Sequence, residues 1–435
     1  MKASLHTLGC KVNAYETDAM EKLLKEAGYE IVPFTESADV VVVNTCTVTN
    51  TADAKSRQML SRARAQNPNA VVVAAGCFVQ TNAAELGQNE GIDILIGNDK
   101  KQELPRLLKE YFKNGKRTAA VDDLAEAGRY FTETPAGLPS VRTRGYLKIQ
   151  DGCDEFCSYC LIPYARGRCR TRAEEEILKE AKTMVNEGAR EIVLTGIHVS
   201  SYGKDNNKTL TALMRELDAL SSEGLLRLRF SSLEPRLVTE DFLSEMEGLK
   251  TFCPHFHLSL QSGSDPVLKR MNRKYTTAEY QEACAMIRDS FSHPAITTDV
   301  ITGFPGETEE EFEETRAFLT RLALAKLHVF PFSERRGTRA AAMEWKVPEP
   351  VKKERARELI SLSASCEEAF RLWYRGRETE VLLETGENGL FTGLNREYVR
   401  FVCETGERNR VVRGKVFASA QGGPDLVVAN PEKKE

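Results

Sequence analysis

Apolar runs alternate with helical stretches from the first residue to about residue 115. Three runs are continuous, which is typical of parallel strands buried on both faces: Leu5–Gly9, Val40–Cys46 and Ala70–Phe78. The spacing of apolar positions predicts helices over Asn13–Gly28 and Asn50–Gln66. The pattern therefore predicts an α/β domain with a parallel sheet at the amino terminus.

A strand–helix alternation restarts at Gly145 and repeats six times. The predicted strands lie in the segments GYLKIQ, EIVLTGI, LRLRFSSLE, PHFHLSLQS, AITTDVITGF and KLHVFPFS. Six such units predict a TIM-type (β/α)6 barrel, complete or partial, with active-site residues at the carboxyl ends of its strands. A long helix, roughly Glu349–Tyr374, is expected to leave this barrel.

After this helix, short β-type runs such as EVLLE, YVRFV, KVFASA and DLVVAN alternate with glycine turns, which is typical of a small OB-like β-barrel. The stretch from Gly128 to Thr143 is rich in Gly, Pro and Thr, has no sustained period and predicts a linker. We thus expect an α/β domain over 1–128, a linker over 129–144, a barrel with its exit helix over 145–374 and a β-barrel over 375–432.

The net charge is −4 and the pI about 6.1, which argues against a protein that coats nucleic acid by bulk attraction. A local segment from Arg142 to Arg172 is nevertheless basic, and it is either an RNA-facing surface or a solvated loop. The start of the chain lacks the pattern of a secretory leader, and no 18-residue stretch is uncharged and strongly apolar. We expect a cytoplasmic protein with no membrane partner.

Eleven cysteines in a cytoplasmic chain are not expected to form disulfides, because that compartment keeps thiols reduced. Six of them fall in two groups, so metal ligation is the leading interpretation for those six. Four others are expected to pack as small hydrophobic side chains: Cys253, Cys284, Cys366 and Cys403.

The first group is Cys153-x3-Cys157-x2-Cys160, directly after the first predicted barrel strand. Three thiolates on one loop can hold three irons of a four-iron cluster and leave one iron open for a reactant. Structural zinc sites usually have four ligands in C-x2-C or C-x4-C pairs, so zinc is the weaker interpretation. Cys169 is expected to be a bystander, because a fourth thiolate would close the open site.

The second group is Cys10, Cys46 and Cys77, which lie 36 and 31 residues apart, each at the end of a predicted strand. In a Rossmann-like parallel sheet the carboxyl ends of the strands meet at one edge, so folding would bring the three thiols together. There they could hold a second cluster with an open iron. From the pattern alone, three unrelated buried cysteines explain these positions equally well.

The C-x3-C-x2-C spacing, with Tyr159 just before its last cysteine, resembles the radical S-adenosylmethionine (SAM) superfamily. The resemblance implies that the open iron chelates SAM, and that an electron from the cluster cleaves SAM to a 5′-deoxyadenosyl radical. It also implies SAM contacts from polar residues at strand ends: Thr195, Gly196, Ser231, Ser232, Glu234, Gln261 and Asp299. Thr308 with Glu311 forms a predicted helix cap of architectural character.

Both cysteine groups together resemble the methylthiotransferase family over nearly the whole chain, including a TRAM-like barrel at the carboxyl end. GCKVN at Gly9–Asn13 resembles the branch that acts on N6-threonylcarbamoyladenosine at tRNA position 37, whereas the isopentenyladenosine branch more often has GCQMN. The resemblance implies two [4Fe-4S] clusters and two SAM molecules. One SAM methylates a sulfur carried on the N-terminal cluster, and the other yields the radical that removes hydrogen from adenine C2. Acid–base catalysis could not activate this aromatic C–H bond.

The implied partners are the tRNA anticodon loop, an electron donor such as flavodoxin or ferredoxin, and a sulfur source. RNA contacts are expected from the basic loops and from the C-terminal barrel, where aromatic residues lie among basic ones: Tyr374, Phe391, Tyr398 and Phe401 with Arg396, Arg400, Arg408, Arg410, Arg413 and Lys415. The alternative for these aromatic residues is a place in the barrel core.

Three other functions are open at this point. The same chemistry could act on isopentenyladenosine in tRNA or on a ribosomal-protein aspartate. A non-catalytic iron–sulfur protein that binds RNA is a hypothesis of another class. A cobalamin-binding N-terminal domain is disfavoured, because residues 1–140 lack an Asp-x-His-x-x-Gly loop and contain only one histidine, His6.

Overall fold

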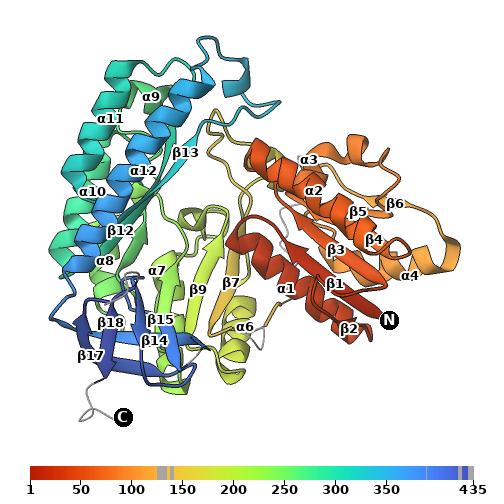
Figure 1. The fold of residues 1–435 in the computed structure, drawn as a ribbon, viewed down its shortest axis with the longest axis horizontal. Coiled ribbons are helices and arrows are strands. Elements are labelled where there is room, and N and C mark those ends of the chain that lie inside the picture. Colours follow the sequence, from red (N-terminus) through yellow and green to blue (C-terminus); the bar gives the residue numbers. More distant parts are fainter. Residues whose placement is uncertain (125–134, 138–141, 388, 420–423, 430–435) are drawn as a thin grey trace.

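The computed structural model describes residues 1–124, 135–137, 142–387, 389–419 and 424–429. Figure 1 shows three units, with an N-terminal α/β unit and a C-terminal β-barrel placed against a central barrel. The linker expected over 129–144 lies mostly outside the described residues. All eleven cysteines are free, and none of the described helices is both long and apolar enough for a membrane span.

The N-terminal unit is a six-stranded parallel sheet. Its strands are β1 (Lys2–Thr7), β2 (Glu30–Ile31), β3 (Val40–Thr45), β4 (Val71–Gly76), β5 (Ile94–Ile96) and β6 (Thr118–Ala120). Its helices are α1 (Lys11–Glu26), α2 (Asn50–Gln66), α3 (Cys77–Leu86) and α4 (Leu104–Asn114). The strand order 2-1-3-4-5-6 follows the flavodoxin-like order and differs from the 3-2-1-4-5-6 order of dinucleotide-binding domains.

Helices cover both faces of this sheet, with α1 and α4 packed on one face and α2 and α3 on the other (Figure 1). This coverage explains the continuous apolar runs of β3 and β4, in which every residue is buried. The three predicted strands and two predicted helices of this unit are confirmed.

The central unit is an open barrel of six parallel strands, and all six are confirmed. They are β7 (Arg144–Asp151), β9 (Glu191–Gly196), β10 (Arg227–Phe230), β11 (His255–His257), β12 (Ala295–Thr302) and β13 (Lys326–Pro331). Parallel bridges from Leu228 to Phe252 and from Leu233 to Leu258 connect β10 with the β11 region. A short antiparallel strand, β8 (Arg170–Thr171), flanks β7.

Helices surround the central barrel and connect its strands. They are α5 (Ile162–Arg166), α6 (Glu174–Asn186), α7 (Leu210–Asp218), α8 (Glu240–Glu247), α9 (Asp265–Arg270), α10 (Thr277–Ser290), α11 (Glu309–Leu322) and the exit helix α12 (Glu349–Leu372). The predicted cap of α11 is confirmed, because Thr308 and Glu311 form a capping box.

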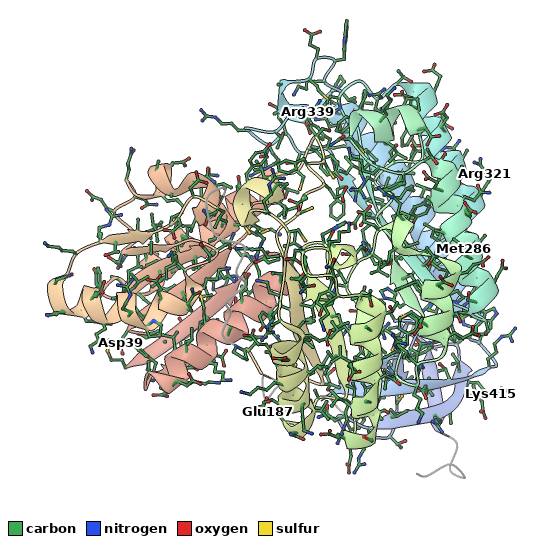
Figure 2. All side chains as sticks on the ribbon, turned by 180° about the vertical axis from the view of Figure 1, so that it is seen from behind. Asp39, Glu187, Met286, Arg321, Arg339 and Lys415 are labelled. Atoms are coloured by element: carbon green, nitrogen blue, oxygen red, sulfur yellow. The ribbon has the colours of Figure 1, made fainter. Side chains whose placement is uncertain are left out.

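The C-terminal unit is a closed five-stranded barrel in the order β14-β15-β16-β18-β17. Its strands are β14 (Glu378–Glu387), β15 (Leu390–Leu394), β16 (Arg400–Cys403), β17 (Val411–Phe417) and β18 (Leu426–Ala429). Arg227 and Arg229, at the amino end of β10, donate to carbonyl groups of this unit. Figure 2 shows Lys415 of this barrel and Arg339, from the loop after β13, at opposite ends of the central unit.

The basic segment from residue 142 to 172 differs from its expected role as an RNA-facing or solvated loop. Four of its basic residues are buried: Lys148, Arg166, Arg170 and Arg172. They pair with carboxylates on α1, β7 and α6: Glu16, Asp151 and Glu180. Burial is tolerated because each charge has an opposite charge at hydrogen-bond or ion-pair distance. Lys148 and Arg166 reach Glu16 on α1 and therefore join the N-terminal and central units.

Candidate functional site

The group of cysteines that we name the N-terminal triad consists of Cys10, Cys46 and Cys77. The three residues directly follow or closely follow the adjacent strands β1, β3 and β4. Cys10 is exposed at the start of α1, whereas Cys46 and Cys77 are buried. The sheet therefore gathers three cysteines that are far apart in the sequence at one edge, as the pattern of strands predicts.

Two glycines allow the loops of the N-terminal triad to approach one another. Gly9 and Gly76 each precede a cysteine and have φ values of +100° and +99°, which other residues rarely adopt. A Cβ atom at Gly9 would lie 2.8 Å from Cys46 Sγ, and one at Gly76 would lie 2.5 Å from Asn44 Oδ1. Larger side chains at these positions would push the loops apart.

Buried amide side chains fix the loops of the N-terminal triad. Asn13 Nδ2 donates to the carbonyl oxygens of Leu8 and Thr45 at 2.7 and 3.0 Å. Asn44 Nδ2 donates to the carbonyl oxygen of Asn13 at 2.9 Å. The segments that precede Cys10 and Cys46 are therefore held by the same side chain.

The other group, which we name the barrel triad, lies on the loop between β7 and α5 and consists of Cys153, Cys157 and Cys160. Gly152 starts this loop with a φ of +72°, and a Cβ atom there would overlap the carbonyl oxygen of Arg168. The backbone N–H of Cys153 donates to the carbonyl oxygen of Gly167 at 3.1 Å. The loop therefore folds back onto the end of α5, which groups its cysteines.

A buried arginine faces the barrel triad. Arg273 Nη1 lies 3.2 Å from Cys157 Sγ, Nη2 donates to Glu234 Oε1 at 2.6 Å, and Nε donates to the Tyr275 hydroxyl at 2.9 Å. Burial favours a higher pKa for Glu234, but His198 and Arg273 hold the pKa of this carboxyl below its ordinary value. A fixed positive charge therefore stands next to one thiol of the triad.

The thiols within each triad influence one another. Burial raises the pKa of Cys46 to about 11, and Cys77 and Cys10 contribute to the rise. Burial likewise raises the pKa of Cys160 to about 12, and Cys157 contributes. Electrostatic interactions of this kind require short separations. The thiols of each triad therefore lie within electrostatic range of one another.

Each triad offers three thiols, the number of protein ligands that a four-iron cluster with one open iron requires. Cys169 is bonded elsewhere, since its Sγ lies 3.3 Å from Gln150 Nε2 and 3.7 Å from the Ser201 carbonyl oxygen. Across the described part of the chain, no three His, Cys, Asp or Glu side chains surround the position of a single metal ion. In a four-iron cluster each thiolate binds a different iron, so its ligands need not share one.

Two buried hydroxyls lie at the carboxyl ends of barrel strands. Thr195 is the last residue but one of β9, and Ser231 directly follows β10. Neither hydroxyl oxygen has a hydrogen-bond partner among the described residues. Such unsatisfied groups fit a polar ligand at this end of the barrel. Close packing also explains the glycine at position 196, because a Cβ atom there would lie 3.0 Å from two oxygens of Gln150.

The other predicted SAM contacts lie at or near the same end of the barrel: Tyr159, Ser232, Glu234, Gln261 and Asp299. Gln261 has a φ of +74° and exchanges backbone hydrogen bonds with β12. Asp299 differs from its expected place at a strand end, because β12 continues for three residues beyond it. Its Oδ2 atom lies 3.3 Å from His257 Nε2. Contact of these residues with SAM stays a prediction.

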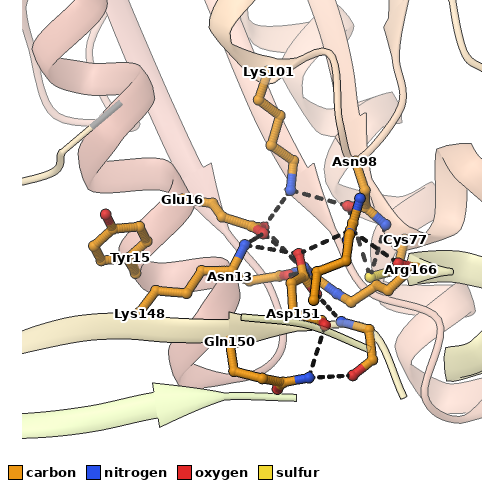
Figure 3. A network of polar contacts seen from close by, with 12 residues as sticks. Asn13, Tyr15, Glu16, Cys77, Asn98, Lys101, Lys148, Gln150, Asp151 and Arg166 are labelled. Carbon is orange, nitrogen blue, oxygen red and sulfur yellow. Dashed lines mark hydrogen bonds and ion pairs between the residues drawn. The ribbon is translucent and has the colours of Figure 1, made fainter. Parts of the chain in front are cut away.

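Sequence patterns did not indicate the buried charge network that joins α1 to the central barrel (Figure 3). Its members are Glu16, Lys101, Lys148, Asp151 and Arg166. Arg166 donates to Glu16 Oε1 at 2.6 Å and to Asp151 Oδ2 at 3.1 Å. The available signal was the dense positive charge after β7, which looks the same in sequence whether it is paired or solvated.

A second contact joins the two units next to Cys46, and no sequence pattern predicts it. Arg335, in the loop after β13, donates to Asp53 Oδ2 and to Thr47 Oγ1, both at 2.7 Å, and to Asn50 Oδ1 at 2.6 Å. Arg335 is buried, so the contact excludes water. The central barrel therefore holds the loop after β3 as well as α1.

The aromatic residues proposed to stack on RNA are mostly committed to packing. Tyr374 and Phe401 lie in the core of the C-terminal barrel, and Phe391 packs against that core. Tyr398 stacks on His255 with ring centroids 4.8 Å apart, at the contact between the two barrels. The alternative of a place in the barrel core is therefore confirmed for Tyr374 and Phe401, because a small barrel needs large apolar side chains in its core.

Two family models match separate segments of the chain. The family model described as the radical SAM superfamily matches residues 147–319, and the model described as the uncharacterized protein family UPF0004 matches residues 2–97. The first match contains the barrel triad and the second contains the N-terminal triad.

Similar proteins include two tRNA-modifying enzymes. The chain is 41% identical over 422 residues to the threonylcarbamoyladenosine tRNA methylthiotransferase MtaB of Bacillus subtilis, which covers 95% of this chain and 93% of that protein. It is 37% identical over 389 residues to the tRNA-2-methylthio-N(6)-dimethylallyladenosine synthase of Moorella thermoacetica, with coverages of 87% and 86%.

Among solved structures, the radical SAM methyltransferase TsrM of Kitasatospora setae matches with a TM-score of 0.56, covering 75% of this chain and 72% of that one. The sequence identity is 17%, so the likeness concerns the fold alone. TsrM has also been solved with cobalamin bound. The fold likeness does not carry that ligand to this chain, whose N-terminal sheet has cysteines at its strand ends.

Proposed function

Because this chain belongs to the radical SAM tRNA methylthiotransferase family, we propose that it adds a methylthio group to C2 of N6-threonylcarbamoyladenosine at position 37 of tRNA. The observation that carries the proposal is the presence of two separate thiol triads. Reductive cleavage of SAM needs one open-iron site. Transfer of a sulfur-containing group calls for a second site, and the N-terminal triad can supply it.

In this proposal the barrel triad and the N-terminal triad each hold one [4Fe-4S] cluster. When bound, the clusters and SAM supply the radical and sulfur-transfer chemistry that no acid or base can perform at an aromatic C–H bond. The protein's own side chains orient the reactants. Thr195 and Ser231 offer buried hydroxyls, and Arg273 holds Glu234 in place for the amino group of SAM.

Lys11 favours threonylcarbamoyladenosine over the dimethylallyl alternative. It follows Cys10 at the start of α1 and is half-buried, and the described residues contain no ion-pair or hydrogen-bond partner for its side chain. Burial lowers the pKa of His255 and His328 inside the barrel, and Lys11 is among the cations that lower it further. A threonyl carboxylate suits such an ammonium, whereas an apolar dimethylallyl group does not.

Mass spectrometry of tRNA nucleosides from a deletion strain tests the substrate. We expect methylthio-threonylcarbamoyladenosine to disappear and methylthio-isopentenyladenosine to remain. If the first nucleoside persists, or the second disappears in its place, the substrate assignment is wrong.

A Lys11→Gln variant tests the recognition of the carboxylate. A hydrogen bond to a charged group contributes about 1.5–3 kcal/mol, so kcat/KM for tRNA should fall by about tenfold or more. The matched control is Lys25→Gln on the exposed part of the same helix, where the charge pairs with Glu21. Equal activity of the two variants would mean that Lys11 does not recognise the threonyl carboxylate.

A further inference from the structure

Each triad is faced by a buried arginine that pairs with a glutamate. Arg273 donates to Cys157 Sγ at 3.2 Å and pairs with Glu234. Arg166 is fully buried, pairs with Glu16 at 2.6 Å and donates to Oδ1 of Asn13, whose amide nitrogen holds the segments before Cys10 and Cys46. Both arginines belong to the central unit, although the N-terminal triad does not. The central unit therefore provides a buried positive charge for each triad.

The position of Arg166 next to the N-terminal triad follows from helix packing. Arg166 ends α5, the helix after the barrel triad, and α5 packs on α3, which begins at Cys77. Asn98 bridges the two helices, because its Nδ2 atom lies 3.5 Å from Cys77 Sγ and donates to the Ala165 carbonyl oxygen at 2.6 Å. Figure 3 shows Arg166 and Cys77 as members of one polar network, which runs from Cys77 through Asn98, Lys101 and Glu16 to Arg166.

The guanidinium of Arg166 is held firmly but keeps one donor unused. Nη1 donates to Glu16 and Asp151, and Nη2 donates to Asn13 Oδ1 at 2.8 Å. Its Nε–H is buried and has no hydrogen-bond partner among the residues described. Other buried arginines share this feature, so its nearness to Cys77 is what distinguishes Arg166. The guanidinium of Arg166 keeps its positive charge, because burial lowers its pKa but Cys77 and Glu16 raise that pKa by more.

We propose that Arg166 is a positioning residue that stabilises the reduced state of the cluster held by the N-terminal triad, acting from the helix that follows the barrel triad. The inference rests on the proposed function, in which the N-terminal triad holds a [4Fe-4S] cluster. Reduction transfers one electron from an external donor to the cluster and makes it more negative. A nearby cation at low dielectric favours that state and raises the reduction potential, whereas the carboxylate of Glu16 opposes it.

A redox titration of the full-length chain tests this role. Cys153, Cys157 and Cys160 are replaced by Ala, so that only the N-terminal triad can be loaded by anaerobic reconstitution. The potential is then followed by electron paramagnetic resonance with dithionite as the reductant. Added to this parent are the variants Arg166→Gln, Arg166→Lys, Glu16→Gln, the double variant Arg166→Gln/Glu16→Gln and, as a control, Arg168→Gln. Arg168 is 64% exposed and pairs with Asp154.

The two charge changes should move the potential in opposite directions. We expect Arg166→Gln to lower it, Glu16→Gln to raise it, and the double variant to return it toward the parent value. Arg166→Lys should keep most of the parent potential, and Arg168→Gln should leave it unchanged because solvent screens that charge. Shifts in the same direction, or no shift in variants that retain about four irons per chain, would overturn the proposal.

The test still gives a result if the Arg166→Gln variant takes up little iron. Arg166→Lys and Glu16→Gln then decide, because only an electrostatic role predicts a retained potential in the first and a raised potential in the second. Any other combination overturns the proposal. The measurement needs neither tRNA nor SAM, so it fails independently of the substrate assignment. A parent that takes up no iron would instead reject the N-terminal cluster of the proposed function.

Discussion

The two triads have the same number of thiols but assemble them in different ways. The barrel triad lies on one loop, within residues 153–160, and its three cysteines are half-buried. The N-terminal triad spans residues 10–77 and depends on three adjacent parallel strands. One site therefore needs a single correctly shaped loop, whereas the other exists only when the whole N-terminal sheet has formed.

Removing one ligand from each triad should give the largest effects. Cys157→Ala should abolish both SAM cleavage and methylthio transfer, whereas Cys46→Ala should abolish transfer and leave cleavage, measured as 5′-deoxyadenosine. Each variant should keep about four of about eight irons per chain, because the other cluster remains. The control Cys366→Ala should keep all of them. If the tRNA modification persists in cells whose only copy of this protein is folded Cys157→Ala, the non-catalytic interpretation is favoured.

Glycine substitutions should affect the iron content of one triad at a time, with a smaller effect than the removal of a ligand. Gly152→Ala adds a clash with the Arg168 carbonyl to an unfavourable φ, so iron should be lost from the barrel triad. Gly9→Ala places a Cβ atom 2.8 Å from Cys46 Sγ and should affect the N-terminal triad instead.

Gly28→Ala is the matched control for these variants. Gly28 has a φ of +85° but no atom within 4 Å of an added Cβ, so the cost should be only about 1–2 kcal/mol and the iron content should not change. Iron counting and SAM cleavage distinguish the variants. Loss of iron from both triads in either Gly152→Ala or Gly9→Ala would show that the two sites do not form independently.

The pH dependence of the network beside the N-terminal triad should be the smallest effect. Burial favours a higher pKa for Glu16, but Arg166, Lys101 and Lys148 hold its pKa well below the ordinary value of 4.5. A lowered pKa means that the stabilisation is fully present above the unfolded-state pKa and is lost as pH falls through the folded-state pKa.

The difference in Tm between the parent and Glu16→Gln should therefore stay constant between about pH 5.5 and 8 and narrow below about pH 4.5. Differential scanning calorimetry across this range measures it. A difference that already narrows at about pH 6 would mean that Glu16 does not remain ionised as this network requires.

Local patterns in the sequence determined much of the fold. The continuous valine runs of β3 and β4, the six strands of the central barrel and the cap of α11 depend on neighbours within a few residues, and all are found in the structure. The spacing of the barrel triad is equally local, so its loop is recognisable in the sequence. The strand ends also placed the N-terminal cysteines at one edge, although the pattern alone allowed three unrelated buried residues.

Tertiary packing decided the remaining features. Arg273 reaches Cys157 across 116 positions of sequence, and Arg166 reaches Glu16 across 150. A basic or aromatic residue has the same identity whether it faces solvent, an ion-pair partner or a core. Its role therefore depends on which distant segment packs against it, and that was decided for Lys148, Arg166 and Tyr374 only when the three units came together.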